Sequence, residues 1–145
     1  MSKLIINLAL FVFLIFFQTS SFGKENFYEK ALNLFKKEKY NEARFLFERN
    51  IVYNPKDANS YLYLAKIYNY EENQRKEEFN LETTLLIDPK NEEALLMLMK
   101  IALKKSNYNR VNELSETFAK VCINMCDENK EIQESLKNIE PENES

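Results

Sequence analysis

Apolar side chains recur every three or four residues along most of the chain after residue 24, which is the spacing of one face of an α-helix. Between residues 25 and 37 these side chains are Phe27, Ala31, Leu34 and Phe35. Glycine occurs once and runs of β-branched residues are rare, so strands are disfavoured. We therefore predict seven helices, at residues 25–38, 41–53, 58–71, 74–87, 92–105, 108–122 and 127–139.

A period of about 34 residues organises these helices. Pro55 and Pro89 lie one period apart, and each follows an apolar stretch and precedes a polar turn. Tyr40 and Tyr108, each followed by Asn, lie two periods apart. Self-similarity at a fixed period of this size indicates stacked structural repeats. The linkers are short, so neighbouring helices are expected to run antiparallel.

The helix expected at 58–71 resembles the first helix of a tetratricopeptide repeat. It carries Tyr61, Leu64, Ala65 and Tyr68 at the spacing of the family signature W-x₂-L-G-x₂-Y, with Tyr for Trp and Ala for Gly. The alternative is an ordinary α-helical bundle in which the proline spacing arises by chance.

The second half of the family pattern is visible one helix earlier. Ala43 and Phe47, followed by Pro55, resemble the second helix of a repeat, whereas Ile123 stands where the third repeat would have its proline. The resemblance implies an all-α, right-handed α-α superhelix of about three helix pairs plus a C-terminal capping helix. In the implied helical repeat domain, residues 24–139, the repeats are 24–57, 58–91 and 92–125, and the cap is 127–139.

The capping role rests on an apolar stripe of Ile132, Leu136 and Ile139, with charged residues elsewhere on the helix. A repeat array needs a terminal element with one apolar and one polar face. The alternative is an amphipathic helix that binds a partner. The tail at 140–145 is expected to be disordered.

Residues 1–23 have the pattern of a secretory signal peptide. Lys3 precedes an almost unbroken apolar run at residues 4–17, and small residues follow, so that cleavage could occur after Ser21 or after Gly23. The run is shorter than the roughly 20 apolar residues of a spanning helix, so cleavage is favoured over retention as a membrane anchor. The pattern predicts an exported protein of the periplasm or cell envelope.

The composition argues against catalysis. The 145 residues include no His, and the only Gly is Gly23. Without His the chain lacks the side chain that titrates near neutral pH and the commonest metal ligand. A single Gly excludes a glycine-rich phosphate loop and a nucleophile elbow. We expect no enzyme activity, no catalytic residue, no cofactor and no metal site.

Charge is nearly balanced, with 23 acidic and 20 basic residues. No basic patch stands out, so nucleic acid is not an expected partner. Glu71, Glu77 and Glu92 are each followed by a second Glu. Since sequence neighbours do not face each other on a helix, these pairs are expected on solvated faces.

Cys122 and Cys126 are the only thiols. In an exported protein they can form a disulfide that joins the third repeat to the cap. The alternatives are two buried free thiols or, less favoured, a redox or metal role, because two Cys without His make a poor zinc site.

The family resemblance also implies where a partner binds, because such arrays usually use a groove lined by the first helix of each repeat. The corresponding residues form an apolar and aromatic groove with lysines toward one end: Tyr28, Leu32, Phe35, Leu62, Lys66, Asn69, Tyr70, Leu96, Lys100, Leu103 and Lys104. Tyr28 and Leu32 cannot act in the carboxylate clamp of some family members. The alternative is that these residues pack against the cap or a second copy.

We therefore expect a non-catalytic protein–protein interaction module or adaptor that binds a peptide or partner domain in this groove. A peptide with hydrophobic anchors and some acidic residues would suit it. The main rival is a self-associating or membrane-tethered structural envelope protein.

Overall fold

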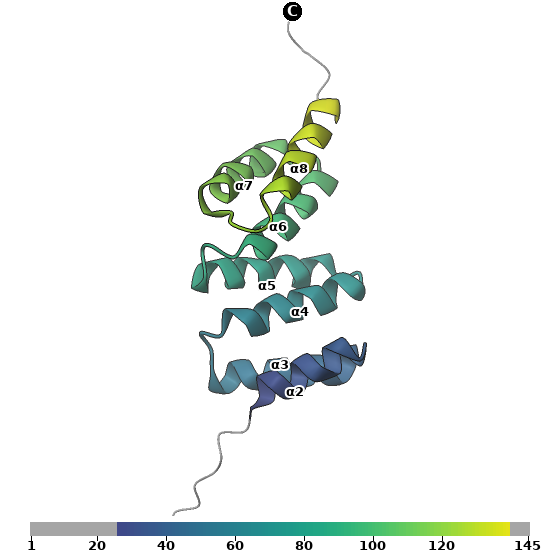
Figure 1. The fold of residues 1–145 in the computed structure, drawn as a ribbon. Helices are drawn as coiled ribbons and strands as arrows, with labels where there is room; N and C mark the ends of the chain where they lie inside the picture. Colours follow the sequence, from purple (N-terminus) through teal and green to yellow (C-terminus); the bar gives the residue numbers. More distant parts are fainter. Residues whose placement is uncertain (1–25, 140–145) are drawn as a thin grey trace, which may run out of the picture.

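The structure, a computed structural model, describes residues 26–139 and contains seven helices in that range (Figure 1). They are α2 (Phe27–Lys36), α3 (Tyr40–Tyr53), α4 (Ala58–Tyr70), α5 (Gln74–Ile87), α6 (Glu92–Lys104), α7 (Tyr108–Val121) and α8 (Cys126–Ile139). Each begins and ends within about two residues of the helix predicted from the apolar spacing. The predicted signal peptide and C-terminal tail lie outside the described residues.

The helices form three hairpins, α2–α3, α4–α5 and α6–α7, stacked one on the next (Figure 1). Helix α3 packs against α4, and α5 against α6, so each hairpin contacts its neighbour through consecutive helices. The last helix, α8, packs on both α6 and α7. The described chain is thus an all-α superhelix of helix pairs that ends on a single covering helix.

The same turn closes each hairpin, and it recurs with the period seen in the sequence. Glu38, Glu72 and Ser106 have φ of 59°, 56° and 54°, the left-handed conformation that commonly ends a helix. Each turn is bridged by a hydrogen bond from the next residue's N–H to a carbonyl five positions earlier: Lys39 to Leu34 (3.0 Å), Asn73 to Tyr68 (2.8 Å) and Asn107 to Ala102 (2.9 Å). Because glycine is absent here, this hydrogen bonding holds non-glycine residues in a conformation they normally avoid.

The core has two parts of different chemistry. The first joins the helices of the first pair to α4 and is rich in aromatic residues: Ala31, Ala43, Phe47, Leu64, Ile67 and Tyr68 are buried, with Tyr28, Phe35, Tyr40 and Tyr63 packed around them. The second runs from α4 to α8 and is mainly aliphatic, with Leu81, Leu95, Leu98, Met99, Val111, Leu114, Ile132 and Leu136 among its buried residues. We call them the aromatic core and the aliphatic core.

The connection from α7 to the covering helix is closed by a disulfide between Cys122 and Cys126, whose Cα atoms are 5.4 Å apart. The helix breaks at residues 122–125, so the two cysteines flank a turn rather than lie on one continuous helix.

The carboxylate of Glu92, at the start of α6, accepts hydrogen bonds from three backbone N–H groups of this turn: Ile123 (3.0 Å), Asn124 (3.1 Å) and Met125 (2.9 Å). Partial desolvation opposes ionisation of Glu92, but the three donors outweigh it, and its pKa lies below the usual range. Glu92 therefore ties the turn before α8 to the first helix of the third pair.

Within residues 26–139, no helix combines the length and the apolar character that a membrane crossing requires.

Candidate partner-binding groove

The first helices of the three pairs, α2, α4 and α6, form one face of the stack, which we call the first-helix face. Two clefts open on it. The aromatic cleft has a volume of about 330 Å³ and is lined by Tyr28, Asn59, Leu62, Tyr63, Lys66, Asn91, Glu92, Glu93, Asn124 and Met125. The lysine cleft has a volume of about 500 Å³ and is lined by Asn69, Glu77, Met97, Lys100, Ile101, Leu103 and Lys104.

Tyr63 is the centre of the aromatic cleft. Its ring stacks on Phe47 with the ring centroids 5.3 Å apart, and it meets the edges of Phe35 and Tyr28 at 5.0 and 6.3 Å. Aromatic pairs in these geometries contribute beyond the area they bury. The wall of the cleft is therefore held rigidly by rings from α2, α3 and α4.

Lys66 spans this cleft. Its Nζ lies 4.6 Å from the centroid of the Tyr63 ring and 2.8 Å from a carboxylate oxygen of Glu93 on the next pair. The ammonium group of Lys66 is therefore paired with a carboxylate and held over an aromatic ring within the protein.

Burial raises the pKa of Tyr28 to about 12, with smaller contributions from neighbouring Tyr63, Asp57 and Glu29. The hydroxyl of Tyr28 therefore stays neutral at physiological pH. It offers a hydrogen-bond donor and acceptor at the edge of an apolar surface, as tyrosines at protein interfaces do.

The lysine cleft lies where α4 and α5 meet α6. Asn69 donates a hydrogen bond of 2.9 Å to the carboxylate of Glu77, which is 5% exposed. Burial raises the pKa of Glu77, while the hydrogen bond from Asn69 and the charge of Lys104 partly offset this effect. The lysine cleft thus combines a buried carboxyl group, aliphatic walls and two exposed lysines.

The expectation that the paired glutamates lie on solvated faces is therefore wrong for Glu77. Glu77 is buried against Asn69, and Glu92 accepts three hydrogen bonds from the turn before α8. Sequence adjacency shows that two neighbours point apart, but not which of them points inward.

The structure brings seven of the eleven sequence-predicted residues into the two clefts: Tyr28, Leu62, Lys66, Asn69, Lys100, Leu103 and Lys104. Leu32 is half-buried and lines neither cleft. Phe35 packs edge-on against the ring of Tyr63, with the ring centroids 5.0 Å apart. Tyr70 is 68% exposed, with its ring 4.4 Å from that of Tyr40.

Leu62, which is 6% exposed, offers little binding surface, and Leu96 offers even less. Leu96 is 3% exposed and belongs to the aliphatic core together with Ile132 and Leu136 of α8. For this residue the alternative interpretation, packing against the cap, is the one the structure supports.

Sequence reasoning missed seven residues that line the aromatic cleft: Asn59, Tyr63, Asn91, Glu92, Glu93, Asn124 and Met125. Tyr63 could have been found, because it lies three residues before Lys66 and therefore on the same helix face. Asn124 and Met125 reach the cleft only because the turn before α8 folds back onto Glu92, and no spacing in the sequence indicates this.

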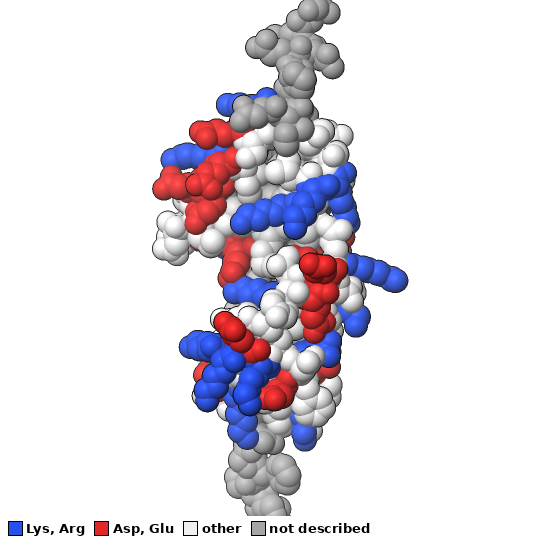
Figure 2. Space-filling model, turned by 90° about the vertical axis from the view of Figure 1, so that its right-hand side faces the viewer, with Lys and Arg blue, Asp and Glu red and all other residues white. Residues whose placement is uncertain are grey.

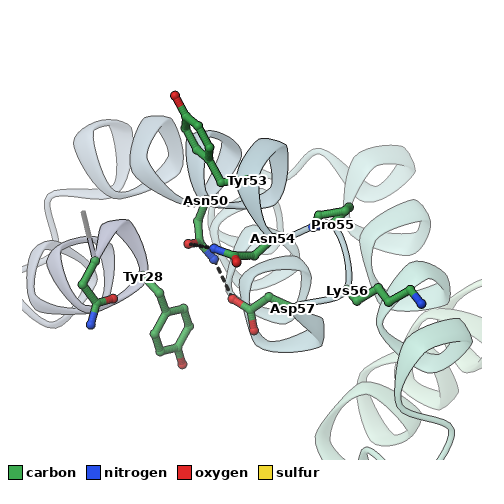
Figure 3. A pocket seen from close by; sticks show the side chains of 8 residues that line it. Tyr28, Asn50, Tyr53, Asn54, Pro55, Lys56 and Asp57 are labelled. Atoms are coloured by element: carbon green, nitrogen blue, oxygen red, sulfur yellow. Dashed lines mark hydrogen bonds between the residues drawn. The ribbon is translucent and has the colours of Figure 1, made fainter. Parts of the chain in front are cut away.

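A third cleft, of about 760 Å³, lies at the end of the stack nearest residue 26, between α2 and the turn from α3 to α4. Figure 3 shows Asn50, Asn54 and Asp57 turned toward one another there. The Asn50 amide donates to Asp57 (2.7 Å) and accepts from Asn54 (3.1 Å), while buried Ser60 donates to Asp57 (2.7 Å). This junction network fixes the turn beside Tyr28.

Charge on the molecular surface is mixed. On the face in Figure 2, basic and acidic side chains form small groups that lie next to one another, and neither sign covers the face. In the part of the chain that the structure describes, no group of three or more Cys, Asp or Glu residues could hold a metal ion.

No protein-family model matches the chain, and no curated protein matches its sequence. Solved structures do resemble it. The type III secretion chaperone SycD of Yersinia enterocolitica, in complex with a peptide of the translocator YopD, matches with a TM-score of 0.72 and 16% identity, over 84% of this chain and 98% of that chain.

Two further structures show the same arrangement. The TPR domain of Sgt2 from Aspergillus fumigatus matches with a TM-score of 0.65 and 15% identity, over 83% of this chain and 86% of that chain. The CopN–Scc3 complex contains a chain that matches with a TM-score of 0.62 and 13% identity, over 87% of this chain and 74% of that chain. The described chain therefore has the fold of a tetratricopeptide repeat domain, as the sequence resemblance implied.

Proposed function

We propose that this protein is a non-catalytic interaction module that holds a peptide, or a short segment of a partner protein, against its first-helix face. The observation that carries the proposal is the presence of two clefts along one face, which together combine aromatic, aliphatic and lysine side chains. Recognition sites for peptide segments typically pair apolar anchor pockets with a few placed polar groups.

The preorganised aromatic cleft supports this proposal. Tyr28 and Tyr63 are held by rings on three helices, so little conformational entropy is lost when they contact a partner. A large apolar side chain of a bound peptide would lie against these rings, with the Tyr28 hydroxyl available to its backbone.

The comparisons support the same proposal by analogy. The structure of SycD holds a peptide of YopD, and the fold of this chain spans almost the whole of that chaperone. The CopN–Scc3 structure is also a protein complex. The absence of His from the sequence makes acid–base catalysis near neutral pH a weaker alternative.

We further propose that residues 1–23 direct export, so that the module acts in the periplasm or cell envelope. The signal-like pattern of the segment and the Cys122–Cys126 disulfide both suit an oxidising compartment. The intact mass of the protein recovered from its own cells tests this. A mass lacking residues 1–23 or 1–21 is expected, and the full-length mass would contradict cleavage.

Site-specific cross-linking in cells tests the binding face. A photo-reactive residue is placed in the full chain at Lys66 or Lys100 on the first-helix face, or at Thr83 on α5 or Lys120 on α7 as controls. We expect one and the same partner to be captured from Lys66 and Lys100 and not from the two controls. Equal capture from all four positions, or capture from the controls alone, would contradict the proposal.

A second candidate function, self-association, is favoured by a specific feature of the second helices. Phe45 and Phe79 are 59% and 66% exposed, and Val52 and Leu86 are 76% and 83% exposed. The members of each pair lie one repeat apart, on α3 and α5. Cross-linking from Thr83 to a second copy, with none from Lys66, would favour this function over peptide binding.

A further inference from the structure

The lysine cleft has a positive charge that the aromatic cleft does not have. Three lysines line the two clefts, and Lys66 is paired with Glu93 at 2.8 Å. Lys100 and Lys104 are exposed, and within residues 26–139 neither has an ion pair. The neighbouring Lys105 is paired with Glu78, outside the cleft.

Lys100 and Lys104 are also placed unfavourably with respect to each other. They lie four residues apart on α6, and like charges at this spacing destabilise a helix. The one carboxyl group that lines the cleft, Glu77, is buried and engaged by Asn69, and no ion pair joins it to either lysine. Even with Glu77 ionised, two cations face one anion, so the cleft retains a positive charge.

The walls around this charge are aliphatic. Met97 and Leu103 are half-buried and Ile101 is buried, and all three line the same cleft as the lysines. A bound group that combines a carboxylate with an aliphatic neighbour would place each part against a matching surface. Met97 suits such a role because its flexible side chain adapts to different apolar shapes.

We propose that the lysine cleft binds an acidic side chain, Asp or Glu, of a partner peptide, and that an aliphatic side chain next to it lies against Met97 and Leu103. This inference rests on the proposed peptide-binding function and adds the chemistry and the place of one contact. The aromatic cleft, where Lys66 is already neutralised by Glu93, takes the uncharged part of the same peptide.

A random-peptide display library tests the inference with a defined probe. Selections are run in parallel with the full chain and with two variants of it, Lys100→Gln/Lys104→Gln and Lys90→Gln/Lys120→Gln. The second pair is the control, because both lysines are exposed, lie outside the described clefts and have no ion pair among the described residues. Circular dichroism confirms that all three forms are folded.

We expect the wild type and the control to enrich peptides with Asp or Glu at one fixed position beside an aliphatic residue. The Lys100→Gln/Lys104→Gln variant should lose this preference. For an enriched peptide, replacing the acidic residue by Gln should weaken binding to wild type about tenfold, consistent with one or two exposed charge pairs. The same replacement should change binding to the Lys100→Gln/Lys104→Gln variant about twofold or less. Added salt should weaken the complex with wild type and leave the complex with that variant unchanged.

Two other outcomes would show whether the inference alone is wrong or the proposed function as well. Enrichment of apolar peptides without an acidic position, or an acidic preference that survives in the double variant, would overturn the inference and leave the proposed function standing. No enrichment of any peptide by the wild type, above a control without protein, would overturn both.

Discussion

The two ends of the stack share one backbone geometry and use different chemistry to hold it. At the junction of the first and second pairs, buried Asn50 and Ser60 bond to Asp57. One period later the equivalent positions are Thr84, Ala94 and Asn91. There Asn91 donates to Asp88 (3.2 Å) and accepts from the N–H of Ala94 (3.0 Å), while buried Thr84 donates to the carbonyl of Asn80 within its own helix.

The two cores also differ in the side chains that fill them. The aromatic core surrounds Phe47 with rings, whereas the aliphatic core is built mainly from Leu, Ile, Val, Ala and Met, with Phe118 as its large ring. The repeat pattern therefore specifies where side chains go, and each pair fills those positions differently. This difference also divides the first-helix face, since the aromatic cleft adjoins the first core and the lysine cleft the second.

The largest effect should come from removing the central ring of each core. Phe47→Ala and Phe118→Ala both remove a fully buried ring, and each should lower the free energy of unfolding by about 3–5 kcal/mol. Phe47→Ala should alter the near-ultraviolet circular dichroism of the tyrosines more than Phe118→Ala, because Phe47 contacts the rings of Tyr28 and Tyr63. Phe118 lies in the aliphatic core, against which Tyr108 packs. Equal spectral changes in both variants would remove the distinction between the two cores.

The disulfide stabilises only the C-terminal end. Its closed loop is short, so the chain-entropy model gives about 2 kcal/mol, which the double variant Cys122→Ala/Cys126→Ala should lose. Hydrogen exchange should accelerate in α8 and leave α2 and α3 unchanged. Faster exchange throughout the stack would show that the two ends are not independent.

The junction network should contribute a smaller, localised amount. Asn50→Ala leaves Asp57 and Ser60 with fewer partners and should cost about 1–3 kcal/mol in denaturant unfolding. Thr84→Val, at the equivalent position one period later, removes a single hydrogen bond to the Asn80 carbonyl and should cost about 1 kcal/mol. A larger loss of unfolding free energy in Thr84→Val than in Asn50→Ala would contradict this comparison of the two junctions.

The smallest expected effect is the pH dependence of the stability that Glu92 contributes. The pKa of Glu92 is lowered in the folded state, so the stability it adds is present above about pH 4.3, the ordinary value in an unfolded chain. It is lost as the pH falls through the lower folded pKa. The difference in unfolding free energy between wild type and Glu92→Gln should therefore shrink on acidification. Glu113→Gln, which removes an exposed partner of Arg110, serves as the control.

Much of the fold could be predicted from the sequence because two strong signals coincide. Apolar spacing gives the helices, and the interval between Pro55 and Pro89 gives the repeat. The covering role expected for the last helix agrees with the burial of Ile132 and Leu136. The left-handed turns at Glu38, Glu72 and Ser106 could not be predicted, because none of them is a glycine.

The candidate site was less predictable. Positions such as Lys66 and Lys100 follow from the repeat register, which places them on the same face of successive first helices. Leu96 follows the same register but is buried in the aliphatic core, which at this end of the array also contains residues of α8. The contact between Glu92 and the turn at 123–125 joins residues about 30 positions apart, beyond the reach of local patterns.

The central claim is that the first-helix face is the binding face, and an NMR titration tests it most directly. The full chain, labelled with ¹⁵N, is titrated with the peptide most enriched by the wild type in the display selection. We predict that backbone shifts change first and most at Tyr63, Lys66 and Lys100, and little at Phe45 and Phe79. Saturable shifts centred on the outward surfaces of α3 and α5, with α4 and α6 unaffected, would contradict the account.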